Sequence, residues 1–213
     1  STSDPEKDKL LIELLTFVLE KGHYNPATMD DEFSKGVYKD YIEALDPSKR
    51  FFLQADIDEF SKYELELDDQ LLNKDLTFFD LTYTRLMQRI EESKSIYKSV
   101  LSKPFDYKAD ESFNTDYEKM PYAKNTTELN ERWRKQIKLS TLSSLVDRLE
   151  IQETNGKIDK DLKEATAPLN VDNGLQETIT DTKKTAVTEK VKIKTFEELE
   201  KETRESSLKS LDE

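Results

Sequence analysis

The sequence contains no cysteine and a single histidine, His23. Without cysteine the chain forms no disulfide, has no thiol nucleophile and holds no metal through thiolates, and either a reducing or an oxidising compartment suits it. A histidine-based metal site or a serine–histidine arrangement would depend on His23 alone. Because His23 follows Gly22 at an expected helix end, an ordinary surface position explains it without any chemistry.

Glycine and long apolar runs are also scarce. The chain has 4 glycines, and no apolar run exceeds three residues. A membrane-spanning helix and the core of a signal peptide both need longer runs, so we expect no membrane span. The polar start, STSDPEKDK, leaves open whether a targeting segment precedes it. With 35% hydrophobic and 37% charged residues, the composition is typical of an all-α helical bundle.

Positive charge is outweighed by negative charge. The chain carries 33 Lys and Arg against 46 Asp and Glu, which gives a net charge of -13 and a pI near 4.8. Such a chain repels a phosphate backbone and offers no basic stripe to attract one. We therefore expect no nucleic-acid partner.

The stretch from His23 to Phe60 indicates two amphipathic helices around an aromatic turn. Asp30 can cap a first helix that reaches Leu45, because four apolar side chains recur there at every fourth position: Phe33, Val37, Tyr41 and Leu45. Pro47 then disfavours helical backbone at Asp46 and sets a turn. The apolar run at 51–53 predicts that this turn is buried.

Apolar periodicity predicts further helices over Asp4 to Lys21, Gln54 to Leu72, Leu76 to Leu101 and Asn125 to Leu149. Gly22 stands at a usual stop position, Pro104 forbids continuation of the long helix, and Asn125 with Glu128 resembles a capping box. The aromatic but aperiodic residues 103–124 predict an ordered loop wrapped on the bundle. The rings expected to be buried are Phe33, Tyr41, Phe51, Phe52, Phe60, Phe79, Tyr83 and Trp133.

Every aromatic residue except Phe196 lies at or before Trp133, so we expect most of the packed core in the first part of the chain. Residues 153–194 have no aromatic side chain and balanced charge, which predicts a linker or mobile insertion. Thr195 and Glu198 then open a last helix. The predicted organisation is a bundle domain at 1–152, the insertion at 153–194, and a helix from 195 to 213 that continues into further regions.

Paired carboxylates are candidates for chemistry, since they can bind hard cations or transfer protons. Each pair stands near a helix start or on a solvated helix face, where ordinary surface charge explains it as well. No calcium-loop spacing accompanies any of them. The pairs are Asp30 with Asp31, Asp56 with Asp58, and Asp68 with Asp69.

Two short motifs complete the candidates. Ser48 and Lys49 have the residue types of a serine–lysine dyad, but neighbouring side chains in a turn point apart and no glycine-rich oxyanion loop accompanies them. Asn125 to Thr127 match a glycosylation sequon by spacing, and a helix start explains them equally. We therefore predict no catalytic, cofactor-binding or metal-binding residue in this chain, and no cofactor.

Several separate positions share one order and spacing: His23 and Tyr24, Asp30 and Asp31, Val37, Tyr41, Leu45 and Asp46, Ser48, the run from Asp56 to Phe60, Glu128 to Asn130, Trp133, and Lys138. In this order the chain resembles the N-terminal helical region of the tail-specific, or carboxy-terminal processing, proteases. The resemblance extends over about residues 9–138. From about Glu150 to Lys194 the chain departs from the family pattern, which leaves the role of that stretch open.

The resemblance implies a periplasmic parent protein of the serine peptidase class. Such a parent would have a PDZ domain that reads a substrate's C-terminal tail, and a protease core whose serine is activated by a lysine. Both would lie outside this chain, so the fragment would be inactive and the parent active. The fragment would help form the vault over the active site, influence which unfolded or C-terminally tagged proteins enter, and offer a surface to an envelope adaptor protein.

Two other classes of protein are compatible with the composition. A free-standing periplasmic helical interaction or scaffold module would have the same bundle, but should close its last helix. An independent carboxylate-dependent enzyme would need a deep pocket with convergent acids of perturbed pKa. Nothing in the spacing of the acidic residues requires such a pocket.

Overall fold

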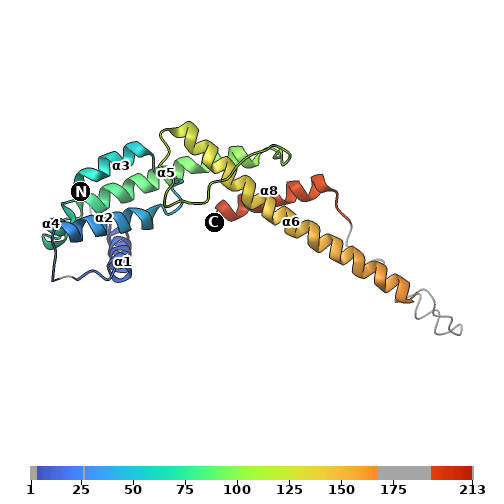
Figure 1. The fold of residues 1–213 in the computed structure, drawn as a ribbon, viewed down its shortest axis with the longest axis horizontal. Helices are drawn as coiled ribbons and strands as arrows, with labels where there is room; N and C mark the ends of the chain where they lie inside the picture. Colours follow the sequence, from blue (N-terminus) through green and yellow to red (C-terminus); the bar gives the residue numbers. More distant parts are fainter. Residues whose placement is uncertain (1–3, 26, 167–192, 213) are drawn as a thin grey trace. The chain divides into compact units, whose positions relative to one another are not determined.

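The computed structural model describes residues 4–25, 27–166 and 193–212, and side chains are described outside 158–166. The described regular elements are helical, as the composition predicted. They are α1 (Pro5–Lys21), α2 (Asp31–Leu45), α3 (Gln54–Phe60), the 3-10 turn η1 (Ser61–Tyr63), α4 (Leu67–Leu72), α5 (Thr77–Leu101), α6 (Thr126–Thr166) and α8 (Phe196–Asp212) (Figure 1). No helix in these ranges has both the length and the apolar character that a bilayer crossing requires.

The chain divides into two compact units. The first comprises Ser1–Val100 and Ala109–Ile137, and the second comprises Leu101–Lys108 and Lys138–Glu213. Helix α6 therefore supplies residues to both. Each unit is described separately below.

The first two helices begin where their caps predict. The Asp4 carboxylate accepts a hydrogen bond from the Glu6 N–H at 3.1 Å, and the Asp30 carboxylate accepts one from the Phe33 N–H at 2.9 Å. Each carboxylate thereby satisfies a backbone donor that the helix leaves unpaired. The stripe predicted for α2 is confirmed, because Phe33, Val37 and Tyr41 are buried and Leu45 is half-buried.

Helix α1 ends differently from the expected glycine stop. Gly22 is its C-cap but has a right-handed φ of -81°, and the left-handed residue is His23, at 53°. Gly22 is needed instead because the Tyr24 ring lies too close to its backbone for any side chain to fit. A Cβ on Gly22 would lie 2.1 Å from the Tyr24 ring, and one on Gly36 would lie 2.6 Å from the Tyr24 hydroxyl. Tyr24 therefore packs against backbone on both α1 and α2.

The helix predicted over Gln54 to Leu72 is wrong as a single element. It is broken into α3, η1 and α4, and the break is stabilised from α2. The Ser34 hydroxyl donates to the Glu64 carbonyl at 2.6 Å and accepts from the Leu67 N–H at 2.9 Å. Because one buried side chain satisfies both backbone groups, the chain can turn there and bury Leu67 completely.

Aromatic rings from α2, α3 and α5 meet in the core of the first unit, with Phe78 at the centre. Its ring lies within 5.3 to 6.5 Å, between centroids, of five other rings, which belong to Tyr38, Tyr41, Phe60, Tyr63 and Phe79. Of the eight rings predicted to be buried, Phe51 and Tyr83 are half-buried against this core and the other six are buried. Phe78 was missed by the prediction, although it is fully buried.

The non-helical stretch before α6 contributes its last residues to the core of the first unit. Met120 and Ala123 are buried, and the Ala123 carbonyl accepts a 2.8 Å hydrogen bond from the Gln54 N–H. Helix α6 then starts at the predicted cap, where the Asn125 side chain accepts from the Glu128 N–H at 2.9 Å. Between Leu101 and α6 the described backbone contains no helix, as the aperiodic pattern predicted.

The second unit is built from α8, the later part of α6 and residues 101–108. Leu145, Leu199 and Thr203 are buried within it. A buried ion pair joins Glu200 to Arg204 at 2.8 Å, and the Arg204 guanidinium also donates to the Leu101 carbonyl. Thr195 caps α8 as predicted, by accepting from the Glu198 N–H.

Helix α6 continues to Thr166, well past the predicted end at Leu149. The first residues of the 153–194 stretch, up to Thr166, are therefore helical. Residues 167–192, on which the predicted linker or mobile insertion mainly falls, lie outside the described residues.

Candidate functional site

The turn at 46–53 is organised by one buried carboxylate. Asp46 accepts hydrogen bonds from the N–H groups of Arg50, Phe51 and Phe52 at 3.0, 3.1 and 2.9 Å. Burial raises the pKa of Asp46, while these three donors and the Arg50 charge oppose that rise. The Asp46 carboxylate thus supplies the hydrogen-bond acceptor for backbone N–H groups that no helix or strand pairs.

The cation of Lys49 closes this turn onto residues 117–122. Lys49 has a left-handed φ of 50°, and its ammonium donates to the carbonyls of Glu118 and Met120 at 3.1 and 2.6 Å. The same ammonium lies 5.0 Å from the centre of the Tyr122 ring. Lys49 therefore acts as a structural donor to two backbone acceptors.

Helix α6 holds the turn from the other side. The Arg132 guanidinium donates to the carbonyls of Lys49 and Pro121, and the Trp133 indole N–H donates to the Arg50 carbonyl at 2.8 Å. The Arg50 guanidinium in turn lies 5.0 Å from the centre of the Trp133 ring. The prediction that this turn is buried is confirmed for Phe52, which has no exposed surface.

Replacing Asp46 by Ala is expected to lower the free energy of unfolding by about 3 kcal/mol, because three N–H donors lose their acceptor and the Phe52 donor is buried. Urea unfolding followed by circular dichroism would measure the change. Glu43→Gln, at an exposed position one turn earlier on α2, is the control and should stay within about 0.5 kcal/mol of the parent chain. Equal stability of Asp46→Ala and Glu43→Gln would contradict this account of the turn.

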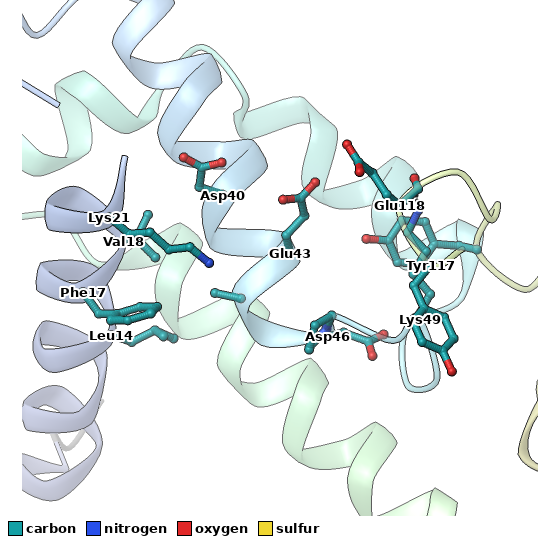
Figure 2. A pocket seen from close by; sticks show the side chains of 13 residues that line it. Leu14, Phe17, Val18, Lys21, Asp40, Glu43, Asp46, Lys49, Tyr117 and Glu118 are labelled. Carbon is teal, nitrogen blue, oxygen red and sulfur yellow. Dashed lines mark hydrogen bonds between the residues drawn. The ribbon is translucent and has the colours of Figure 1, made fainter. Parts of the chain in front are cut away.

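A groove of 590 Å³ lies beside this turn, between α1 and α2 and the residues around Tyr117. Figure 2 shows Leu14, Phe17 and Lys21 on the α1 side, with Asp40 and Glu43 on α2. The Tyr24 hydroxyl donates to the Asp40 carboxylate at 2.5 Å, and burial together with this hydrogen bond raises the pKa of Tyr24. The groove is thus lined by both apolar and charged side chains.

A second buried carboxylate, Asp56, joins α3 to α5. One oxygen accepts from Arg85 at 2.6 Å and Arg89 at 2.9 Å, and the other accepts from Arg89 and from the Leu53 N–H, both at 2.9 Å. Burial alone would raise the pKa of Asp56, but the hydrogen bonds from Arg89, Leu53 and Arg85 outweigh it, so the net shift is downward. Asp56 is thus held ionised as a structural anchor.

The other sequence candidates are scattered over separate positions. His23 is exposed at the end of α1, Asp30 is a cap, and Asp31, Asp58 and Asp69 are exposed. Asp68 is buried, and its Oδ1 has no hydrogen-bond partner among the described residues. Within residues 4–25, 27–166 and 193–212 no three His, Asp or Glu side chains converge on one point as metal ligands would.

The motif candidates also have structural roles. The Lys49 ammonium is hydrogen-bonded to two carbonyls, so it is a donor and not a base for Ser48. The Asn125 side chain is the cap of α6, as the alternative to a glycosylation site proposed. Lys49 and Asn125 therefore stabilise a turn and a helix start in the described structure.

Comparison with known proteins agrees with this arrangement. The model of the family described as "Tail specific protease N-terminal domain" matches residues 15–212, almost the whole chain. The chain belongs to this family. The tail-specific protease of Haemophilus influenzae is 31% identical over 157 residues, which cover 73% of this chain and 22% of that protein. The chain therefore spans about a fifth of the length of this curated relative.

Sequence reasoning missed the long-range polar contacts within this tail-specific protease N-terminal domain. Arg85 and Arg89 stand four residues apart on α5, which places them on one helix face, and that spacing was the available signal for a shared acidic partner. The donor roles of Lys49 and Arg132 had no such signal, because their acceptors are backbone carbonyls distant in sequence. The groove also had no signal in the sequence, because it depends on how α1 and α2 pack.

Proposed function

We propose that this chain is the non-catalytic N-terminal helical domain of a periplasmic serine protease that degrades or processes proteins from their C-terminal end. In this proposal it shapes the vault through which unfolded or C-terminally tagged substrates pass, and it offers a surface to an envelope adaptor protein. The parent chain in this proposal also contains PDZ and protease domains outside this sequence. Residues 153–194, of which 153–166 continue α6, connect the bundle to α8.

The match of residues 15–212 to one N-terminal domain family carries this proposal. A relative whose printed name is tail-specific protease has most of its length outside the matched region. In this proposal the domains that carry out the chemistry lie in that remaining length. The roles found for Asp46, Asp56 and Lys49 support the same proposal. Each is committed to hydrogen bonds that hold the fold.

The 213-residue chain is expected to show no peptidase activity by itself, because none of its described side chains forms a nucleophile–base pair with an oxyanion-binding loop. The test incubates it with an unfolded protein that ends in an apolar tail and follows cleavage by gel electrophoresis. The full-length parent should degrade this substrate, and the parent without residues 1–149 should lose or misregulate that degradation. Specific cleavage by the 213-residue chain that one substitution abolishes would contradict the proposal.

The parent without residues 1–149 also separates the proposal from its alternative. If the chain were a free-standing helical interaction or scaffold module, it would belong to no protease, and the protein that contains it would degrade the substrate neither with nor without residues 1–149. A changed product pattern, with the catalytic regions still folded by circular dichroism, is the result expected of a domain that controls entry.

A further inference from the structure

The groove between α1 and α2 has two walls of different chemistry. The α1 wall is apolar, because Leu14, Phe17 and Val18 line it, and Phe17 is 54% exposed. Leu10, also exposed, stands one turn before Leu14 on the same face of α1 and extends this wall beyond the groove. An exposed apolar strip that borders a concavity is typical of a site where another molecule binds.

The opposite wall and the far end of the groove are acidic. Asp40 and Glu43 project from α2, and Glu118 stands at the far end (Figure 2). Among the residues that the structure describes, none forms an ion pair with these three carboxylates. Asp40 already accepts a hydrogen bond from the Tyr24 hydroxyl, whereas Glu43 and Glu118 are exposed, so the negative charge of these two is available to a ligand.

The two lysines of the groove do not cancel this charge. The Lys49 ammonium is already bound to two backbone carbonyls and the Tyr122 ring. The Lys21 ammonium projects from α1 into the groove towards α2 (Figure 2), 5.8 Å from the centre of the Phe17 ring, and this one cation leaves the carboxylates in excess. A ligand that enters between Phe17 and Glu43 thus meets an apolar surface on one side and carboxylates on the other.

We propose that this groove binds a short peptide segment of another protein in which apolar side chains alternate with lysine or arginine. The apolar side chains of the segment pack on Leu14 and Phe17, and its cations pair with Glu43 and Glu118. Charge complementarity selects this occupant over an acidic or purely apolar one, because only cations neutralise the α2 wall. The inference goes beyond the proposed function and does not depend on it, since it concerns binding by this chain alone.

The test uses the full 213-residue chain and a fluorescently labelled synthetic peptide of repeated Leu-Lys-Phe-Lys units. Fluorescence anisotropy should show saturable binding that weakens between about 50 mM and about 500 mM salt, because added ions screen exposed charge pairs. The same peptide with Glu in place of each Lys should not bind. Failure of the lysine peptide to bind, or equal binding of the glutamate peptide, would overturn the proposal.

Two groove variants probe the two walls separately. Glu43→Lys combined with Glu118→Lys should weaken binding about tenfold by placing like charges against the peptide. Phe17→Ala should weaken binding about fivefold through lost apolar contact, with little change in the salt dependence. Circular dichroism and thermal unfolding would show whether each variant keeps the fold, and the exposed positions of these side chains make that the expected result.

Matched controls lie at exposed positions outside the groove. Glu153→Lys combined with Glu205→Lys makes the same change of charge, and Ile12→Ala removes an apolar side chain that is 57% exposed, yet none of these residues lines the groove. Both control variants should bind the peptide as the parent chain does. A loss in the controls that equals the loss in the groove variants would show general surface attraction and overturn the proposal.

Self-association is the competing explanation for an exposed apolar wall. Analytical ultracentrifugation of the unsubstituted 213-residue chain should detect no dimer that is lost when Phe17 is replaced by Ala. If such a dimer forms and the lysine peptide does not compete with it, the occupant of the groove is a second copy of the chain, and the proposal is wrong.

Discussion

Replacing Phe78 by Ala is expected to lower the free energy of unfolding by about 4 kcal/mol, because a fully buried aromatic side chain leaves a cavity that its neighbours fill only in part. Phe78 contacts rings from α2, α3 and η1 as well as its own helix. Its removal therefore weakens several interfaces at once. A loss of this size is a large part of the total stability of a typical domain.

Urea unfolding followed by far-ultraviolet circular dichroism measures this loss. The matched control is Phe17→Ala, which removes the same atoms from a ring that is 54% exposed, and it should cost well under half as much. A midpoint for Phe78→Ala that equals the midpoint for Phe17→Ala would show that the first unit has no such core.

Phe78 also shows where periodicity stops being informative. Successive residues of a helix point about 100° apart, so a single apolar stripe contains either Phe78 or Phe79. The stripe through Phe79 and Tyr83 predicts a one-sided helix. In the structure both phenylalanines are buried, because α5 is covered by α2 on one side and by α3 and η1 on another.

Elements that depend on local signals were predicted well. The starts of α2 and α6 follow from Asp30 and Asn125, whose side chains act on backbone donors only three residues away. The turn after α2 follows from Pro47 in the same way. The acceptor role of Asp46 is local too, since its donors lie four to six residues further along the chain. An aspartate at that distance before a segment with no helix or strand pattern was therefore a signal that the sequence contained.

Elements that depend on distant partners were not predictable. The break between η1 and α4 is held by Ser34, which lies 30 residues earlier in the sequence than the Glu64 carbonyl that it binds. Apolar spacing alone favoured one continuous helix there. The groove has the same origin, since its walls belong to two helices whose packing is decided by Tyr24 between Gly22 and Gly36.

The acidic pairs illustrate the same limit at the level of single residues. Asp56 and Asp58 look alike in the sequence, since both lie within the same short helix. Only Asp56 faces α5, where Arg85 and Arg89 lie 29 and 33 residues further along the chain. Their difference in burial is therefore a property of the tertiary structure.

Replacing Asp56 by Asn is expected to lower the free energy of unfolding at neutral pH by about 3 kcal/mol, because the change leaves Arg85 and Arg89 largely buried without their shared counter-ion. Asn keeps the size of the side chain, so packing changes little. The control is Asp58→Asn on the same helix, whose exposed carboxylate should contribute less than about 0.5 kcal/mol. Urea titration of both variants beside the parent chain measures the difference.

The pH dependence identifies the charge as the cause. The folded pKa of Asp56 lies below its unfolded value of about 3.9, so its contribution is fully present above that value and is lost as the pH falls through the folded pKa. The stability gap between the parent chain and Asp56→Asn should therefore be constant from about pH 7 to about pH 5 and should narrow below about pH 4. A gap that stays the same at every pH would mean that shape and not charge makes Asp56 important, and the ionic anchor between α3 and α5 would have to be abandoned.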